Sequence, residues 1–489
     1  MKNGGTSVRK ALSLTFVRSG VSFVLSAVAL VLISRLLTPS EIGVFSVAAA
    51  LVALAQMLRA FGIGEFIIQE KNLTPDLVRT AFTVNLMVAC ALAAILFGTS
   101  NLVGQFYGDP GAGRVTRVLS LVFVLMPFGA IPMAYMRREM QFDIVVRIQL
   151  VESTVRSVSS VALAYLGFSY MSMAWAAVIA MAVSVAGCAL WGGPYRVGGF
   201  GLTQWKRVLH FGTNRTFSDI VKEVGQRSAD IVIGRTLGMA AAGFYSRGYG
   251  VVNMFRSNVV LIVTSVAFPA YARDHREANA APLLFRKSLV YLTGISWPFF
   301  AFATLMAFPV IRIAFGSQWD ASVPLMRWLC GSAILGTLVY QCDNLLTAVG
   351  RYREVTWIET QYQLVRIALA VIASFYGLEA IAASQILVYV VAVILYYRKL
   401  ICYDALHLKV LAVALLPSLG LTIATSIIPV AVLVFWPTNQ YVPAFLVAAA
   451  GASITWLAGV FLLGHPLSDE IRRMLARLHS RIRPAASSN

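Results

Sequence analysis

Fourteen apolar segments follow one another along this chain, each about as long as the 20 residues that an α-helix needs to cross the hydrocarbon of a membrane. Of the 489 residues, 58% are hydrophobic and only 12% are charged, roughly half the charged fraction of a soluble domain. The sequence therefore predicts an all-α integral membrane protein with about 14 transmembrane helices. We place these helices at residues 12–34, 43–66, 80–102, 116–135, 148–167, 172–191, 210–233, 246–270, 288–310, 322–345, 358–376, 378–397, 410–434 and 443–463.

The basic residues are distributed unevenly between the two sides of the predicted membrane. With the N-terminus in the cytoplasm, the cytoplasmic segments hold 25 of the 40 Lys and Arg residues, the opposite loops hold 7, and 8 lie inside helices. Because cytoplasmic loops are enriched in Lys and Arg, this asymmetry predicts that both termini are cytoplasmic. The net charge of +19 then faces anionic lipid headgroups and requires no nucleic-acid partner.

The two ends of the chain have distinct compositions. The apolar run at 11–34 is too long for the core of a signal peptide, so we interpret it as the first membrane span. Residues 466–489 form a basic tail that we place in the cytoplasm. Its segment 471–483 has the pattern of a basic amphipathic helix on the membrane surface, and a solvated helix without a partner is the alternative.

The cysteine and histidine residues show none of the spacings of metal or disulfide sites. The five cysteines are scattered, and the five histidines form no HxxxH or HExxH pattern. We therefore expect no cofactor and no structural metal.

An internal repeat relates the two halves of the chain. Residues 33–46 recur as 233–246, so that Arg35, Gly43 and Ser46 match Arg235, Gly243 and Ser246 at an offset of 200. Further along, Val155-Arg156 matches Val365-Arg366 at an offset of 210. Because six helices separate the copies, both copies run in the same direction through the membrane.

This repeat predicts two pseudo-symmetric six-helix lobes around a central cavity, an arrangement typical of transporters. We place the N-lobe at 1–195 and the C-lobe at 196–405. Two further transmembrane helices at 406–465 precede the tail. Chance similarity among apolar helices is the alternative, and the matching Arg and Gly positions argue against it.

One predicted helix, 210–233, carries a stripe of charged and polar residues about 100° wide and cannot face lipid. The stripe consists of Arg215, Asp219, Lys222, Glu223, Gln226 and Asp230. The pairs Arg215–Asp219 and Glu223–Arg227 have i,i+4 spacing, so a structural ladder of ion pairs and a binding surface are both open. If transport is coupled to an ion, the three acids Asp219, Glu223 and Asp230 are the candidates.

Five further arginines lie inside predicted helices: Arg18, Arg59, Arg156, Arg256 and Arg366. Arg156 has an acid, Glu152, one turn away, and the other four have none. Arginine binds phosphate bidentately and stays charged, so a cavity lined with these residues favours an anionic cargo. We take these five, with Arg215 and Lys222, as candidate substrate-binding residues, and the alternative is that each snorkels or pairs with a remote acid.

Several segments resemble one known family. Residues 35–45 (RLLTPSEIGVF), 233–247 (IGRTLGMAAAGFYSR) and 106–109 (FYGD) look like those of Wzx-type polysaccharide flippases. These belong to the MOP superfamily of multidrug, oligosaccharidyl-lipid and polysaccharide exporters. The resemblance covers nearly the whole chain in the order, spacing and number of segments.

The resemblance implies a V-shaped, two-lobed transporter that works by alternating access and is not an enzyme. Its implied cargo is undecaprenyl-diphosphate-linked oligosaccharide, moved from the cytoplasmic to the periplasmic leaflet of the bacterial inner membrane for O-antigen, capsule or exopolysaccharide. Membrane lipids, a polysaccharide polymerase and chain-length machinery are the implied partners. In related lipid II flippases arginines of the first two spans line the cavity, and Arg18 and Arg59 are the nearest candidates here.

Three other functions are weighed against this one. A lipid II-type or other wall-precursor flippase shares the plan. A multidrug or cation exporter of the same superfamily usually has an acid in the first span, where this chain has Arg18. A membrane polysaccharide polymerase or ligase typically has a long periplasmic loop, and none of the outer loops here is long.

Overall fold

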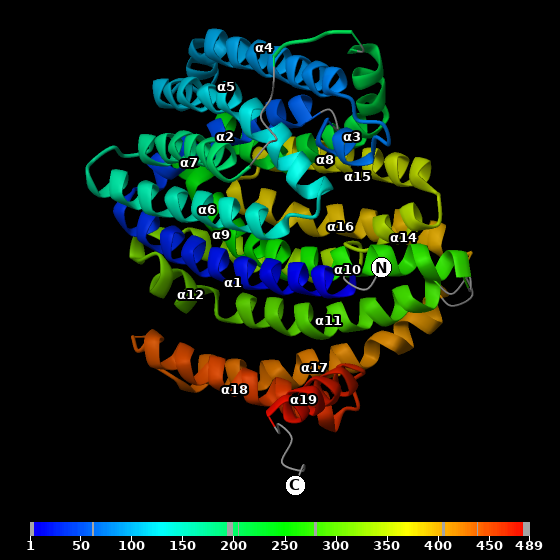
Figure 1. Ribbon diagram of the computed structural model, residues 1–489. Coiled ribbons are helices and arrows are strands. Elements are labelled where there is room, and N and C mark those ends of the chain that lie inside the picture. Colours follow the sequence, from blue (N-terminus) through cyan, green and yellow to red (C-terminus); the bar gives the residue numbers. More distant parts are fainter. Residues whose placement is uncertain are drawn as a thin grey trace. The chain divides into compact units, whose positions relative to one another are not determined.

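The computed structural model describes the backbone of residues 4–60, 63–192, 199–203, 205–277, 281–402, 406–437 and 439–482. Within helices, the side chains of 4–19, 60, 65, 207–219, 261–262, 265–266, 276–277, 474–475 and 477–482 are outside the description. The described ranges contain helices and no strand (Figure 1). The predicted all-α class is therefore confirmed.

The helices follow one another with short connections. They are α1 (Gly4–Leu36), α2 (Pro39–Ala60), α3 (Ile63–Gln69), α4 (Pro75–Tyr107), α5 (Pro110–Arg138), α6 (Phe142–Tyr165), α7 (Met171–Trp191), α8 (Trp205–Thr236), α9 (Met239–Phe255), the π-helix η1 (Arg256–Val260), α10 (Leu261–Glu277), α11 (Ala281–Leu305), α12 (Ala307–Ala314), the 3-10 helix η2 (Ser317–Trp319), α13 (Ser322–Thr337), α14 (Cys342–Ala348), α15 (Tyr352–Ser374), α16 (Leu378–Leu400), α17 (Leu408–Phe435), α18 (Tyr441–Leu462) and α19 (Leu467–Ile482).

Among the described residues, the fourteen predicted spans fall mostly on helices, and the span 322–345 is interrupted at 338–341. Within the described residues, nine stretches are long and apolar enough to cross a membrane, on α2, α4, α5, α7, α11, α13–α14, α16, α17 and α18. The remaining five predicted spans lie on α1, α6, α8, α9–α10 and α15. These five predicted spans carry every candidate charge except Arg59. On α1, the part with described side chains, Gly20–Leu36, is apolar but shorter than a full span. The nine stretches confirm a multi-pass membrane protein, and the number fourteen is consistent with them.

The connection between α4 and α5 shows how the sequence terminates one span and starts the next. The Thr74 hydroxyl accepts from the Leu77 N–H at 3.3 Å and caps the start of α4. The helix ends at Tyr107 and is followed by Gly108 in the left-handed conformation, with a φ of 67°. The Asp109 carboxylate then accepts from the Gly111 N–H at 2.7 Å and starts α5. Side-chain caps satisfy backbone donors that the first turn leaves open, so the two spans reverse direction within two residues.

The two copies of the repeat make the same backbone turn. Between α1 and α2, the Leu37 N–H donates to the Ile33 carbonyl at 2.9 Å. Between α8 and α9, the Leu237 N–H donates to the Ile233 carbonyl at the same distance. The second bond of each corner also matches, from Ile42 to Thr38 and from Ala242 to Gly238. A shared hydrogen-bond pattern at an offset of 200 supports the repeat independently of residue identity.

The equivalent corners also pack against each other. A Cβ at Gly43 would overlap the carbonyl oxygen of Met239, and a Cβ at Gly243 would overlap the carbonyl oxygen of Pro39. One turn further on, the hydroxyls of Ser46 and Ser246 lie 3.1 Å apart. Each contact has a counterpart with the two copies exchanged, as in an isologous interface. The α2 and α9 N-termini are therefore related by local pseudo-two-fold symmetry.

The chain forms two compact units, which we describe separately. Unit 1 comprises Met1–Ser246 and Gln363–Ile381. In it, α4 packs along α5, α6 packs along α1 and α7, and α2 packs against α5 and α8. Unit 2 comprises Arg247–Tyr362 and Ala382–Asn489, with α11 packed against α10, α13 and α17 and with α17 packed along α18. The lobe boundaries predicted from the repeat stay a prediction.

A polar cluster holds α19 to the helices of unit 2. The Leu467 N–H donates to Nδ1 of His465 at 3.2 Å, so the ring proton resides on Nε2 and is donated to the Ser418 hydroxyl at 3.0 Å. Ser418 in turn lies 2.9 Å from the Thr293 hydroxyl on α11. His465, Ser418 and Thr293 are fully buried, so this chain of bonds links α11, α17 and the α18–α19 connection.

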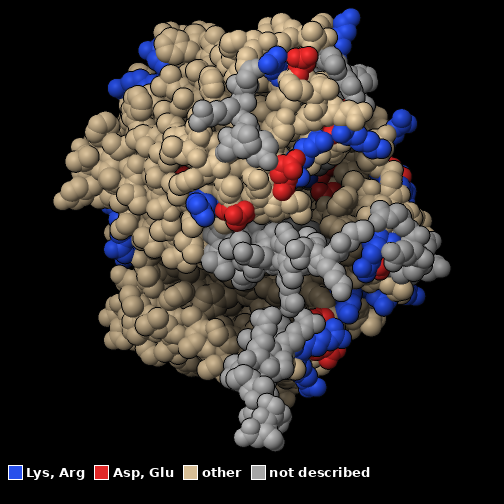
Figure 2. Space-filling view, in the orientation of Figure 1, with Lys and Arg blue, Asp and Glu red and all other residues tan. Residues whose placement is uncertain are grey.

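Figure 2 shows that the visible surface over the helices is largely uncharged. The visible charged side chains lie along the right and left edges of the view, with a few nearer its middle. This distribution fits helices whose middle sections face lipid.

Candidate functional site

Arg59 on α2 forms the clearest candidate site. Its Nη1 donates to Oδ1 of Asn85 on α4 at 3.2 Å. Asn85 is only 1% exposed. It lies about 15 Å along the helix axis from the first residue of α4, at a rise of 1.5 Å per residue. Nε of Arg59 and Nδ2 of Asn85 are both buried and have no hydrogen-bond partner among the described residues.

The two unpaired atoms of this site are both hydrogen-bond donors. Both are N–H donors, because the Asn85 oxygen is already directed at Arg59. Buried donors are normally satisfied, so this pair is suited to an acceptor that comes from outside the protein. An oxygen of a phosphate group is the acceptor that arginine fits best.

Arg366 on α15 is the most buried of the candidate arginines that the structure describes, at 7% exposed. Its Nη1 donates to Oε1 of Gln363 at 3.1 Å. Gln363 is pressed against α8, where a Cβ at Gly225 would overlap the Gln363 amide oxygen. The absence of a side chain at Gly225 therefore allows α15 to approach α8 and positions the partner of Arg366.

Arg156, the residue equivalent to Arg366 in the repeat, has a different environment. Nη2 of Arg156 lies 2.7 Å from Oε1 of Glu152 in an i,i+4 ion pair, and its side chain is half exposed. The sequence predicted this neighbour correctly. Because Glu152 already neutralises Arg156, Arg156 is a weaker phosphate candidate than Arg59.

The charged stripe is on α8, and part of it can be described. Nε of Arg227 lies 2.8 Å from Oε1 of Glu223, which is one of the two ion pairs that the spacing predicted. Asp230 interacts electrostatically with the hydroxyl of Tyr107. Lys222 is half-buried. The side chains of Arg215 and Asp219, like that of Arg18 on α1, lie outside the described residues, so the second pair stays a prediction.

Arg256 is the first residue of the π-helix η1, in the middle of a predicted span. Its Nη2 lies 3.4 Å from Oδ1 of Asn253. Single-turn π-helices inside α-helices are frequent at functional sites. The sequence identified Arg256 as a candidate but gave no indication of the irregular backbone.

Arg247 is a buried arginine that was not among the candidates from the sequence. In the structure it lies within α9 and is 6% exposed. Its guanidinium stacks on Trp319 at 5.5 Å and on Phe315 at 6.0 Å. The two aromatic rings belong to the α12–η2 hairpin, whose contact with α9 could not be read from the sequence.

Glu359 on α15 is a second residue that the sequence analysis passed over. It is 3% exposed, and its two carboxylate oxygens accept from the hydroxyls of Tyr362 and Tyr396, each at 2.8 Å. An acid inside a predicted span is a recognisable signal, and Glu359 stands in the span 358–376. It is therefore a further candidate for a coupling-ion site.

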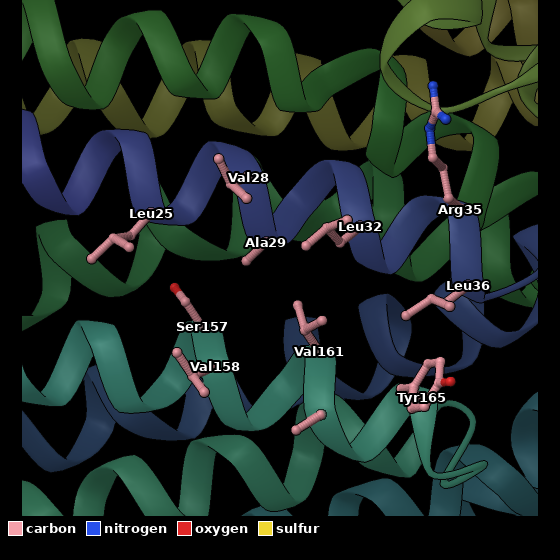
Figure 3. Close-up of a pocket in the computed structure, with 11 residues that line it drawn as sticks. Leu25, Val28, Ala29, Leu32, Arg35, Leu36, Ser157, Val158, Val161 and Tyr165 are labelled. Atoms are coloured by element: carbon pink, nitrogen blue, oxygen red, sulfur yellow. The ribbon is translucent and has the colours of Figure 1, made fainter.

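An apolar groove with a volume of about 540 Å³ runs between α1 and α6. Leu25, Leu32, Val158 and Val161 are among the side chains that line it, and Figure 3 shows the guanidinium of Arg35 directed away from the groove. A groove without an inward charge suits a hydrocarbon chain and not a diphosphate. It is separate from the Arg59–Asn85 pair, which lies on α2 and α4.

No group of three or more His, Cys, Asp or Glu side chains that could hold a metal ion occurs among the residues described. What the structure brings together are local pairs: Arg59 with Asn85, Arg156 with Glu152, Glu223 with Arg227, and Arg366 with Gln363. Of these, only the first leaves buried donors on both of its members.

Solved structures share this fold. A lipid II flippase MurJ in an inward closed conformation aligns with a TM-score of 0.77 over 93% of this chain and 99% of that chain, at 12% identity. An inward-facing multidrug resistance MATE family transporter of the MOP superfamily aligns with a TM-score of 0.59 over 78% and 95% of the two chains, at 15% identity. At these identities the similarity shows the fold alone, and it is the fold that the resemblance implied.

Curated relatives agree with the family that the motifs indicated. The lipopolysaccharide biosynthesis protein WzxC of Escherichia coli (strain K12) is 25% identical over 333 residues, 67% of each chain. The succinoglycan biosynthesis transport protein ExoT of Rhizobium meliloti (strain 1021) is 25% identical over 366 residues, 73% of this chain and 71% of that protein. Residues 32–324, well over half of the sequence, match the family described as "Polysaccharide biosynthesis protein". The chain belongs to this polysaccharide biosynthesis family, which includes the Wzx-type flippases that its motifs resemble.

Proposed function

We propose that this protein is a flippase that moves an undecaprenyl-diphosphate-linked oligosaccharide from the cytoplasmic to the periplasmic leaflet of a bacterial inner membrane. Its membership of a polysaccharide biosynthesis family and its transporter fold support this proposal. The cargo is a repeat unit of O-antigen, capsule or exopolysaccharide. It is a carrier and not an enzyme, and both of its termini lie in the cytoplasm.

The Arg59–Asn85 pair is the observation that carries the proposal. A diphosphate must leave water to cross the membrane, and that desolvation is costly unless the protein supplies charge and donors. Arg59 supplies a permanent positive charge, and the open N–H groups of Arg59 and Asn85 supply donors of the right kind. A cation held by a neutral amide keeps its charge available, which a local carboxylate would cancel.

The remaining candidates have graded roles in this proposal. Arg18, Arg156, Arg215, Lys222, Arg256 and Arg366 are proposed to add positive potential along the path of the cargo. Asp219, Glu223 and Asp230 stay candidates for a coupling ion, with Glu223 weakened by its ion pair with Arg227. The lobes 1–195 and 196–405 are proposed to provide alternating access, and a polymerase with its chain-length machinery would take up the exported unit.

Deletion of the gene and complementation test this proposal. In the deletion strain, surface polysaccharide should disappear and lipid-linked repeat units should accumulate on the cytoplasmic side. The wild-type gene should restore export, whereas Arg59→Ala should restore little of it, because the lost charge-assisted hydrogen bonds weaken diphosphate binding by on the order of tenfold or more. Membrane insertion, followed by a C-terminal fluorescent fusion, should be unchanged.

Arg473→Ala provides a matched control. Arg473 is an exposed arginine on α19 that pairs with Glu470 at 3.0 Å, and its replacement should leave export intact. Normal polysaccharide on the deletion strain, in the absence of a redundant transporter, would contradict the proposal. Wild-type export by Arg59→Ala would remove Arg59 as the phosphate contact.

A lipid II-type flippase is the second candidate, because the fold match to MurJ covers nearly the whole chain. Both cargoes carry a polyprenyl diphosphate, so the Arg59–Asn85 pair is compatible with either. The two functions differ in phenotype. Loss of a lipid II flippase stops cell-wall growth, whereas loss of a polysaccharide flippase leaves cells viable without their surface polymer, so viability of the deletion strain separates them.

A further inference from the structure

Two irregular backbone segments lie within the membrane-spanning helices of unit 2. The π-helix η1 at Arg256–Val260 stands midway between the start of α9 and the end of α10. Residues 338–341 interrupt a second span, between α13 and α14. The π-helix keeps its backbone hydrogen bonds within the helix. Non-helical backbone at membrane depth, as at 338–341, is tolerated only where protein covers it or where it lines a water-filled cavity. In transporters, broken helices of this kind commonly surround the cargo site.

The break at 338–341 is held in place by a buried hydrogen-bond cluster. Oε1 of Gln341 accepts from the hydroxyl of Tyr271 and, at 2.9 Å, from the hydroxyl of Ser288. Tyr271 and Gln341 are both fully buried. The interruption is therefore a fixed element of the structure. Tyr340, which lies within it, contacts other side chains than Gln341 does.

Tyr340 links the two irregular segments. Its hydroxyl interacts electrostatically with Arg256 of η1 and with Tyr249 of α9. Its ring stands edge-on to that of Tyr389 on α16, with centroids 6.5 Å apart and planes at 89°. Gly336 leaves room for both rings, because a Cβ there would lie 3.0 Å from each of them.

Polar groups are buried around these rings. The Tyr340 hydroxyl is buried beside Tyr389, and Nε2 of Gln385 is buried without a hydrogen-bond partner among the described residues. Gln385 is 7% exposed and precedes Tyr389 by one turn, so both lie on one face of α16. Asn253 on α9 and Ser257 on η1 are exposed within the predicted span 246–270, where polar side chains are expected to face water or protein and not lipid.

We propose that Asn253, Ser257, Tyr340, Gln385 and Tyr389 form a subsite for the oligosaccharide of the cargo. Hydroxyl and amide groups both donate and accept, which matches the many hydroxyls of a sugar ring. Tyrosine rings add a flat apolar face for the C–H face of the sugar and a hydroxyl at the edge. The donor-only pair at Arg59 selects an anion by contrast, so the two groups of side chains differ in the chemistry that they bind. This inference rests on the proposed function and specifies how its sugar is bound.

Two probes separate the subsite from the diphosphate site. Purified full-length protein is titrated with undecaprenyl diphosphate, and separately with the undecaprenyl-diphosphate-linked oligosaccharide extracted from the deletion strain. Wild-type protein should bind the glycolipid more tightly. Tyr340→Ala and Gln385→Leu should each weaken glycolipid binding by on the order of tenfold and leave undecaprenyl diphosphate binding unchanged. Arg59→Ala should weaken both.

Asn253→Leu tests the subsite with a variant that should fold normally, because Asn253 is exposed and its replacement leaves the packing of the helices intact. Tyr376→Ala, at an 80% exposed tyrosine, is the matched control and should bind like wild type. If the folded variants keep the wild-type preference for the glycolipid, or lose both probes equally, the subsite is wrong while the flippase function stands. If the wild-type protein binds neither probe, the proposed function fails as well.

Discussion

The hydroxyl groups of Ser46 and Ser246 lie 3.1 Å apart, although 200 residues separate them in the chain. The two serines occupy the same position in the two copies of the repeat, so the pair lies on a local pseudo-two-fold axis. Gly43 and Gly243 stand on either side of this axis, each against the backbone of the other copy. Close approach of helices through small residues is a common way to pack helices in membranes, where hydrophobic attraction between helices is weak.

Replacing Gly43 by Ala adds only one methyl group, yet it should destabilise the protein strongly. The added methyl would overlap the Met239 carbonyl oxygen, which is backbone and cannot rotate away. We expect a loss of about 1–3 kcal/mol, measured as a lower midpoint of thermal unfolding in detergent. Gly98→Ala is the control, because nothing lies within 4 Å of a Cβ at Gly98, and it should leave the midpoint unchanged or slightly raised. An unchanged midpoint for Gly43→Ala would mean that the two corners are not in contact.

Asn85→Asp should abolish export while preserving the fold. The carboxylate is nearly isosteric with the amide, but it would pair with Arg59 and cancel the charge that the cargo needs. Export should fall to the level of Arg59→Ala, and the thermal midpoint should be maintained. Asn101→Asp tests the effect of added charge alone, since Asn101 accepts from Arg117 at 2.7 Å near the other end of α4. Export by Asn85→Asp at the wild-type rate would show that the positive charge of Arg59 is dispensable.

Trp319→Ala should cost about 3–5 kcal/mol, the usual range for removing a large buried aromatic side chain. Trp319 is fully buried beside Arg247 and Phe315, so its loss leaves a cavity and uncovers a buried cation. Trp328→Ala on α13 removes a side chain of the same size that is 42% exposed, and it should cost far less. Comparable midpoints of thermal unfolding for the two variants would contradict the observed packing of the α12–η2 hairpin.

The stability of unit 2 should decrease as the pH falls. Burial lowers the pKa of His465 below the ordinary value of about 6.5, because removal from water disfavours the charged ring. The unfolded chain then binds a proton more readily than the folded chain, so the stabilisation is complete above that ordinary value and is lost as the pH drops through the lowered pKa. Unfolding midpoints measured from about pH 7 to about pH 5 should fall, and His465→Gln should flatten the curve. The same slope in His465→Gln would assign the effect to another group.

The sequence predicted the helices well because membrane spans are long and apolar, and their termination by Pro, Asp and Gly is local. The internal repeat could also be recognised in the sequence. The contact between its two copies, at Gly43 and Gly243, became visible only in the structure. The breaks at 256–260 and 338–341 were not predicted, because neither segment contains a proline or glycine that would signal a break. Their shape depends on tertiary contacts such as those of Gln341 with Tyr271 and Ser288.

The candidate site was predicted only in part for a similar reason. Arginines in apolar helices stand out, so Arg59 and Arg366 were found. Asn85 did not stand out, because a neutral amide in a long apolar run barely changes its hydropathy, and its importance arises from its distance to Arg59. Arg247 was not a candidate because it stands at the very start of the predicted span 246–270, whereas α9 begins eight residues earlier and buries it.

The reciprocal placement of Gly43 and Gly243 also constrains how the two halves of the chain can evolve. After a duplication, copies are free to diverge wherever a change affects one half alone. Here a bulkier residue in either copy collides with the main chain of the other, and no side-chain substitution in the second copy can make room. The ancestral symmetry is therefore retained at this crossing as a physical necessity, even where the surrounding sequences have drifted apart.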